Sequence, residues 1–283
     1  MAAGVRQVLD WFAGSEAILR AERAVLSAST TAGGEDRISA LHNHLLRDIV
    51  SRLHARDAAR TAALASRWRH LWRSTTLVFH DALSCQPEHA AAVARALAGH
   101  PGPFATVSIR YCDFRCQSPE LAECPRLLAA KGVRDLVLVN APADLDHLPD
   151  APADLDHLPD APAEVLSCAS LRRLFLGYFR FPDTGAGLPG REEGLFRRLR
   201  ELVLLGVDMP DYDHLDRLLA RSPVLDTLVV VQSQIFHHIH LHSQSLKCAL
   251  LWSYYAHEVA LKLESLTRSR ARAPWFRVSR YWR

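Results

Sequence analysis

The sequence predicts an α/β protein in which a short helical module precedes a solenoid of strand-containing repeats. Apolar residues recur with helical spacing between Asp36 and Arg73, and the pattern LxxLxL recurs further along the chain. Hydrophobic residues make up 49% of the chain and charged residues 23%, the proportions of a folding globular protein. No apolar run approaches the roughly 18 residues needed to span a bilayer. The composition therefore excludes collagenous, disulfide-rich and membrane-spanning classes.

Residues 1–35 are predicted to be a variable N-terminal segment and linker. Val8, Leu9 and Phe12 fit a short helix, and the stretch SASTTAGGE that closes the segment is typical of a flexible linker. The six cysteines of the chain stand at irregular positions and form no disulfide framework. They favour a reduced, intracellular compartment, the cytoplasm or the nucleus.

Residues 36–73 are predicted to form a compact helical module. An apolar helical face about ten residues long begins the module. Its members are Leu45, Leu46, Ile49, Val50 and Leu53. In the next segment, alanines, leucines and tryptophans alternate with arginines. Short helices of this kind bury little area alone, so the module needs a partner or the rest of the chain for stability.

Residues 74–262 are predicted to form the repeats. The units are FATVSI (104–109), VRDLVL (133–138), LRRLFL (171–176), LRELVL (199–204), LDTLVV (225–230) and LKCALL (246–251). The differences between successive starting positions are 29, 38, 28, 26 and 21. This period with LxxLxL is typical of leucine-rich repeats, in which a short strand is followed by a returning segment. A generic α/β fold with buried strands remains the alternative.

The longest of these spacings has a visible cause. The decapeptide APADLDHLPD stands at 141–150 and again, unchanged, at 151–160, and removing one copy restores a spacing of 28. Its proline and aspartate steps predict an extended loop between repeats. An insertion there costs about 1 kcal/mol or less in loop-closure entropy. We expect a tandem duplication without function; a functional acidic loop is the alternative.

Residues 36–73 resemble the F-box of plant F-box/leucine-rich-repeat proteins. The resemblance includes the DRIS lead-in, the LLxxIxxxL helix, the RTxxL run and the closing SRWRxLW. It continues through KGVRDLVLVN and RLRELVLLGVDM to about residue 262. It implies that the F-box docks on a Skp-type adaptor, and through it a cullin, while the repeats hold a target protein. Such a chain is the substrate-recognition subunit of an SCF-type (Skp-cullin-F-box) E3 ubiquitin ligase and not an enzyme.

The resemblance also assigns residues. The adaptor-facing positions that it implies are Leu41, His42, Leu45, Leu46, Ile49 and Leu53. The F-box core positions that it implies are Leu64, Trp68, Leu71 and Trp72. An intramolecular core is the alternative for Leu45, Leu46 and Ile49. His42 and His54 stand where the family usually has proline, and because proline fixes φ, histidine leaves the entry loop more freedom to lose on binding.

Residues 263–283 are predicted to be a disordered basic tail. Residues 268–283 hold six arginines and no acid, so the positive charge of the chain is a property of its end. The resemblance thins after about residue 262, which suggests a truncated member of the family. We therefore expect Leu246, Leu250 and Leu251 to lie in a layer without a successor. The arginines and aromatic residues of the tail also offer an alternative function, nucleic-acid binding, over which a disordered basic tail is favoured.

Other candidate sites are weak. His238, His240 and His242 would share one face of a strand, but no carboxylate or thiol spacing accompanies them, so a solvated strand face is favoured over a metal site. Cys112, Cys116 and Cys124 lack the paired spacing of zinc sites. The sequence contains no catalytic motif and implies no cofactor or metal. A repeat-based scaffold no longer coupled to a ligase is the second hypothesis for function.

Overall fold

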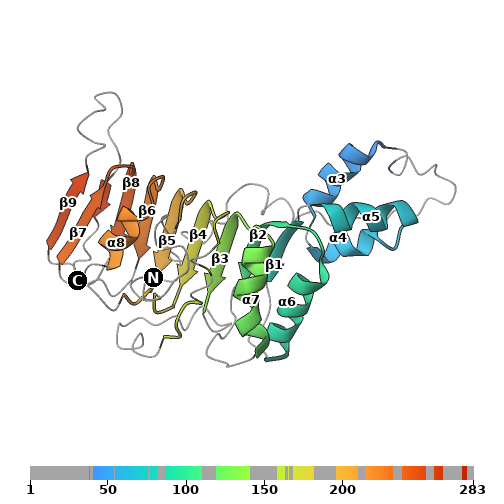
Figure 1. Ribbon diagram of the computed structural model, residues 1–283, viewed down its shortest axis with the longest axis horizontal. Helices are drawn as coiled ribbons and strands as arrows, with labels where there is room; N and C mark the ends of the chain where they lie inside the picture. Colours follow the sequence, from blue (N-terminus) through green and yellow to red (C-terminus); the bar gives the residue numbers. More distant parts are fainter. Residues whose placement is uncertain are drawn as a thin grey trace. The chain divides into compact units, whose positions relative to one another are not determined.

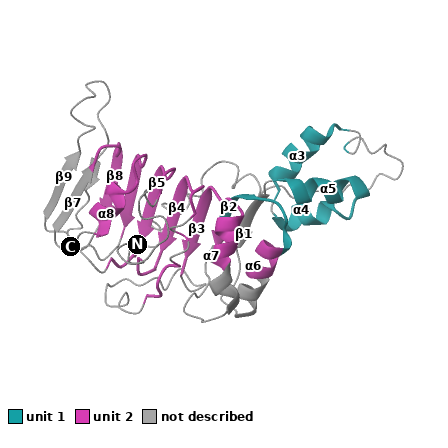
Figure 2. Ribbon diagram, viewed as in Figure 1, with its two compact units in different colours: residues 1–80, 99–107 teal, residues 81–98, 108–283 magenta. Residues whose placement is uncertain are grey.

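The fold is taken from a computed structural model, which describes most of the helices and strands. The described residues are 38, 41–53, 55–75, 77–81, 87–109, 119–140, 158–162, 165, 168–181, 196–209, 214–231, 238–252, 258–263 and 276–278. They form two compact units (Figure 2). Unit 1 comprises residues 1–80 and 99–107, and unit 2 comprises residues 81–98 and 108–283.

Unit 1 is built on three short helices, α3 (Asn43–Ser51), α4 (Ala55–Thr61) and α5 (Ser66–Ser74). Both α3 and α4 pack on α5. Each helix contributes small or large apolar side chains to the shared core. The buried ones are Leu46 and Val50 of α3, Ala58 of α4, and Trp68 and Leu71 of α5. Unit 1 also contains most of β1 (Leu77–Asp81) and the first part of β2 (Phe104–Ile109).

A histidine ties the end of α5 to a later part of unit 1. The ring of His100 is buried, with Nε2 2.9 Å from the carbonyl oxygen of Trp72 and Nδ1 3.1 Å from that of Gly102. The same ring lies 5.0 Å from the ring of Phe104. These contacts fix the residues that follow the helical module, because a buried imidazole is stabilised only where its polar atoms have partners.

Unit 2 contains a parallel sheet in which strands with the repeated pattern are neighbours (Figure 1). The strands with the pattern follow in the order β3 (Asp135–Val139), β4 (Arg173–Gly177), β5 (Glu201–Leu205), β6 (Thr227–Val231) and β8 (Cys248–Trp252). The sheet continues with β10 (Phe276–Val278), which lacks the pattern and pairs with β8. The register places equivalent positions of neighbouring repeats side by side, as in Leu136 opposite Leu174 and Leu174 opposite Leu202. The predicted LxxLxL strands and the α/β class are therefore confirmed.

The remaining elements of unit 2 are helices and a second small sheet. The helices are α6 (Pro87–Gly99), α7 (Pro119–Ala130) and α8 (His214–Ala220). A two-stranded parallel sheet pairs β7 (His238–Ser243) with β9 (Glu258–Leu263). In α8, Leu215, Leu218 and Leu219 are buried at the i, i+3 and i+4 spacing of one helical face.

The core of unit 2 extends over both faces of the strands. The alternating leucines, such as Leu202 and Leu204, are fully buried, and so is Val203 between them. The pattern repeats in β3, β4 and β6, where every residue after the first is buried. Burial on both faces is typical of parallel strands, whose sequences are nearly continuous apolar runs. In β3, β4, β5 and β6, the accessible position is therefore the first residue of the strand.

The tail differs from the prediction. Residues 276–278 of the segment expected to be disordered form β10, which pairs in parallel with β8, so that Phe276 lies opposite Ala249 and Val278 opposite Leu251. The layer with Leu251 thus has a successor. The physical reason is that an edge strand presents backbone N–H and C=O groups that a short extended segment can pair. The other residues of 263–283 lie outside the described part of the chain, apart from Leu263 at the end of β9.

The end of the duplicated decapeptide joins a second ladder of backbone contacts. The Arg180 N–H donates to the Pro159 carbonyl (2.9 Å), and the Ala161 N–H donates to the Arg180 carbonyl (2.8 Å). Bridges pair Asp160 with Arg180 and Arg180 with Asp208. Leu158, Pro159 and Asp160 are the described residues of the two copies, and 141–157 lie outside the described part.

Candidate functional site: an exposed apolar stripe on α3

The helix α3 carries two neighbouring apolar stripes, and one of them is exposed. Leu46 and Val50, four residues apart, are completely buried against the unit. Leu45 and Ile49, also four residues apart, lie about 100° further round the helix and are 43% and 38% exposed. Adjacent exposed aliphatic side chains at helical spacing are typical of a surface that a protein partner covers. We call Leu45 and Ile49 the α3 stripe.

The start of α3 is held by an arginine from α5. Arg67 Nε donates to Asn43 Oδ1 (2.8 Å), and an Arg67 terminal nitrogen donates to the Leu41 carbonyl (2.7 Å). These bonds fix the loop that enters α3, and with it the orientation of the α3 stripe. Sequence reasoning gave Arg67 no role; its only signal was its place beside Trp68 in the closing SRWRxLW.

His42 occupies the N-cap position of α3 with a proline-like backbone. Its φ is −66° and its ψ is 148°, and its side chain makes no capping hydrogen bond. Its Nδ1 instead lies 2.9 Å from Nδ1 of His44, so one of the two nitrogens carries the shared proton. Because proline holds φ at about −65°, the conformation expected where the family has proline is present here with histidine.

The predicted adaptor-facing residues divide into three groups by their exposure. His42, Leu45 and Ile49 are exposed, and Leu41 and Leu53 are half-buried. Leu46 is 0% exposed, so its assignment to the interface is corrected: it packs inside unit 1, because it lies on the side of α3 that meets α5.

The predicted core residues also divide. Trp68 and Leu71 are buried, and Trp72 is half-buried. Leu64 is 70% exposed, which corrects its assignment to the core. The reason is local: α4 ends at Thr61, and Leu64 lies in the turn before α5, where no helical face directs it inward.

The other candidate sites give no metal or reactive centre within the described residues. Those residues contain no cluster of three or more His, Cys, Asp or Glu side chains that could hold a metal ion. His238, His240 and His242 occupy alternate positions of β7, and their side chains lie outside the described part. Cys124 is buried, and burial raises the pKa of its thiol to about 11. Cys112 and Cys116 lie outside the described residues.

No helix in the described part is both long and apolar enough to cross a membrane.

The helical module of unit 1 and the repeats of unit 2 together define a class of protein, in which an F-box is joined to leucine-rich repeats. A family model of the F-box domain matches residues 38–80, and the model "FBD-associated F-box protein At5g56370, LRR repeats" matches residues 121–273, more than half of the chain. The chain therefore belongs to the plant F-box proteins with leucine-rich repeats. The resemblance predicted from the sequence is confirmed, while the domain boundaries at 36–73 and 74–262 stay predictions.

Individual relatives agree with this assignment. The chain is 28% identical over 207 residues to the F-box/LRR-repeat protein At3g26922 of Arabidopsis thaliana, covering 71% of this chain and 61% of the relative. It is 49% identical over 48 residues to the F-box/FBD/LRR-repeat protein At5g22660 of the same plant, 17% of this chain and 11% of the relative. The chain thus spans about three fifths of the first relative and a smaller part of the second.

Proposed function

We propose that this protein is the substrate-recognition subunit of an SCF-type E3 ubiquitin ligase. In this proposal, unit 1 docks on a Skp-type adaptor and through it on a cullin, and the repeats form a solenoid that holds a target protein. The protein itself is a receptor without catalytic activity, and it acts in the cytoplasm or the nucleus.

The α3 stripe is the observation that carries the proposal. A module of three short helices leaves Leu45 and Ile49 exposed while burying Leu46 and Val50. Each side chain is about two fifths exposed, so covering it contributes roughly 0.6–1.2 kcal/mol, two fifths of the value for a fully exposed aliphatic side chain. Family membership supports the same reading, because the exposed stripe lies in the segment that matches the F-box domain.

The test introduces charge into the stripe. Leu45→Asp combined with Ile49→Asp should abolish binding to a purified Skp-type adaptor, because each carboxylate would be buried without a partner in the interface. Binding is measured by surface plasmon resonance, and circular dichroism checks that the helices remain. Val224→Asp is the matched control, because Val224 is a similarly exposed aliphatic residue (41%) of unit 2 and should leave adaptor binding unchanged.

Two outcomes would contradict the proposal. Undiminished adaptor binding by the double variant would show that the α3 stripe is not the interface. Absence of adaptor binding by the unaltered chain would favour the alternative, a repeat-based scaffold that is not coupled to a ligase.

A further inference from the structure

Three arginines occupy the same position in consecutive repeats of unit 2. Arg134, Arg172 and Arg200 each directly precede the first residue of a strand, β3, β4 and β5 respectively. Backbone bonds make them neighbours: the Arg172 N–H donates to the Arg134 carbonyl (2.7 Å), and the Arg200 N–H donates to the Arg172 carbonyl (2.8 Å). All three side chains are exposed. We call these residues the arginine row.

Within the described part of the chain, the arginine row has no acidic partner, whereas nearby basic residues do. Arg173 Nε lies 2.8 Å from Glu201 Oε2, and Arg180 lies between Asp160 and Asp208. The described repeats therefore place acids beside other arginines but none within ion-pair distance of the row. Neighbouring strands are about 4.8 Å apart, and like charges side by side on adjacent strands are destabilising. Fold stability thus gives no reason for the row.

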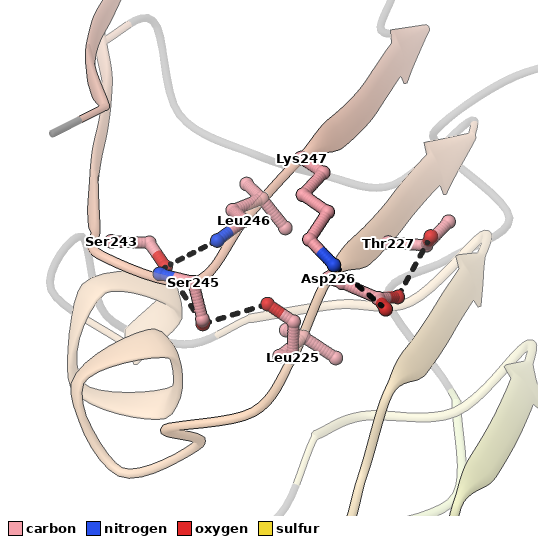
Figure 3. Close-up of polar contacts among 7 residues, drawn as sticks. All are labelled: Leu225, Asp226, Thr227, Ser243, Ser245, Leu246 and Lys247. Atoms are coloured by element: carbon pink, nitrogen blue, oxygen red, sulfur yellow. Dashed lines mark hydrogen bonds and ion pairs between the residues drawn. The ribbon is translucent and has the colours of Figure 1, made fainter. Parts of the chain in front are cut away.

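The next position along the row is an acid that is already engaged. The Asp226 N–H donates to the Arg200 carbonyl (2.9 Å), but the Asp226 carboxylate lies 3.8 Å from Lys247 Nζ and accepts from Thr227 Oγ1 (3.1 Å) (Figure 3). The turn that leads to Lys247 is fixed, because Ser245 Oγ donates to the Leu225 carbonyl (2.7 Å). The basic surface is therefore short and ends at Asp226.

We propose that the arginine row binds an acidic or phosphorylated segment of the target protein. The inference rests on the proposed function, since it names the class of target segment that the repeats hold. Guanidinium groups bind carboxylates and phosphates with paired hydrogen bonds. Three of them at strand spacing span about 10 Å, the length of about three residues of an extended peptide.

A peptide fits the row better than a nucleic acid does. Asp226 ends the row, because its N–H donates to the carbonyl of the last row arginine, Arg200. A continuous phosphate backbone that follows the strands would run on past Arg200 and meet this acid, whereas a short acidic segment ends before it. Single-stranded nucleic acids also need aromatic platforms for stacking. The large exposed apolar side chains of the described residues are all aliphatic.

The experiment measures binding of labelled probes to the full chain by fluorescence anisotropy. The probes are a hexaglutamate peptide, a neutral hexapeptide with one phosphoserine, and a twelve-nucleotide oligothymidine. Replacing all three row arginines (Arg134→Ala, Arg172→Ala and Arg200→Ala) should weaken binding of at least one peptide about ten-fold or more. Comparison of the two peptides distinguishes carboxylates from phosphate as the recognised group.

The control removes the same charge elsewhere. Arg56→Ala, Arg69→Ala and Arg95→Ala together take away three exposed arginines outside the row and should change peptide affinity by less than about two-fold. A further variant, Arg172→Gln, should weaken peptide binding without lowering the melting temperature of the chain, because it relieves repulsion within the row. A purely structural role for the row predicts a lower melting temperature instead.

The outcomes separate this inference from the proposed function. The triple row variant should still bind the Skp-type adaptor, and the Leu45→Asp, Ile49→Asp variant should still bind the peptide. If the adaptor does not bind but a peptide binds in a way that depends on the arginine row, the proposed function is contradicted and the inference about the arginine row is supported. The inference about the arginine row is overturned if neither peptide binds, or if the triple substitution leaves peptide binding unchanged. It is also overturned if the oligothymidine binds more tightly than either peptide does.

Discussion

The two units of this protein treat their apolar side chains differently. In unit 1, α3 buries one stripe and exposes the next, so Leu45 is 43% exposed beside a fully buried Leu46. In unit 2, strands β3 to β6 bury every residue after the first, and the accessible positions at their starts are largely charged. Unit 1 thus exposes aliphatic side chains on a helix, whereas the accessible positions of these strands of unit 2 carry mainly charge.

The largest expected effect contrasts one leucine from each unit. Leu202→Ala should lower the free energy of unfolding by about 2–5 kcal/mol, because Leu202 is fully buried in β5 and its truncation leaves a cavity. Leu45→Ala should change it by less than about 0.5 kcal/mol, because the side chain already contacts water. Urea unfolding followed by circular dichroism measures both. Equal losses would show that Leu45 is part of a core, and the contrast between the units would be lost.

A pair of glycines tests how tightly the repeats pack. Gly206 and Gly132 both have positive φ, +57° and +65°, so alanine is strained at either position. A Cβ at Gly206 would lie 2.7 Å from the ring of the buried Tyr178, whereas a Cβ at Gly132 meets nothing within 4 Å. Gly206→Ala should therefore cost about 1–3 kcal/mol more than Gly132→Ala. Equal costs in urea unfolding would mean that the Tyr178 ring moves aside freely.

A smaller effect is expected at the start of α3. His42→Pro should stabilise unit 1 by about 0.4–1 kcal/mol, because φ is already −66° and proline restricts the unfolded chain. Hydrogen exchange of the α3 amides should slow accordingly, and adaptor affinity should rise. His42→Ala is the control that removes the imidazole without fixing φ. Faster exchange in the proline variant would show that the ring clashes with the entering loop.

The smallest effect concerns the duplicated decapeptide. Deleting residues 151–160 leaves Leu148, Pro149 and Asp150 directly before Ala161, so the contacts with Arg180 can form as before. Stability should change by no more than about 0.6 kcal/mol, the scale of halving a loop. Asp160→Ala should likewise cost only a few tenths of a kcal/mol, because this side chain is 77% exposed and 3.8 Å from Arg180. A loss of cooperativity in urea on deletion would show that the second copy packs into the repeats.

Much of the repeat region could be predicted from the sequence, because a strand that is buried on both faces is a nearly continuous apolar run. VRDLVL, LRRLFL and LRELVL mark β3, β4 and β5, and the spacing from β3 to β4 equals the 28 residues from β4 to β5 once the duplication is recognised. β10 could not be predicted in this way. Phe276–Val278 carries no leucine pattern, and its pairing depends on the open edge of β8 rather than on its own side chains.

For the candidate site, the sequence predicts the helix α3 but not which of its apolar residues are buried and which are exposed. Leu45, Leu46, Ile49 and Val50 form one broad apolar face in the sequence, and periodicity alone does not say which half meets α5. Tertiary packing makes that choice, and it buries Leu46 and exposes Leu45. The role of Arg67 was likewise invisible, because its partners, Asn43 and the Leu41 carbonyl, lie more than twenty residues away.

The bridge at Arg180 has a consequence for how the gene can change. The contacts of the duplicated segment with Arg180 involve its final Pro159 and Asp160 and the following Ala161. Every copy of the decapeptide ends in the same residues, so an in-frame gain or loss of a whole copy again places Leu-Pro-Asp before Ala161. We therefore expect the number of copies to vary among closely related genes, because such changes are under weak selection. A change of reading frame or of copy length would displace the backbone contacts with Arg180, and we expect selection to remove it.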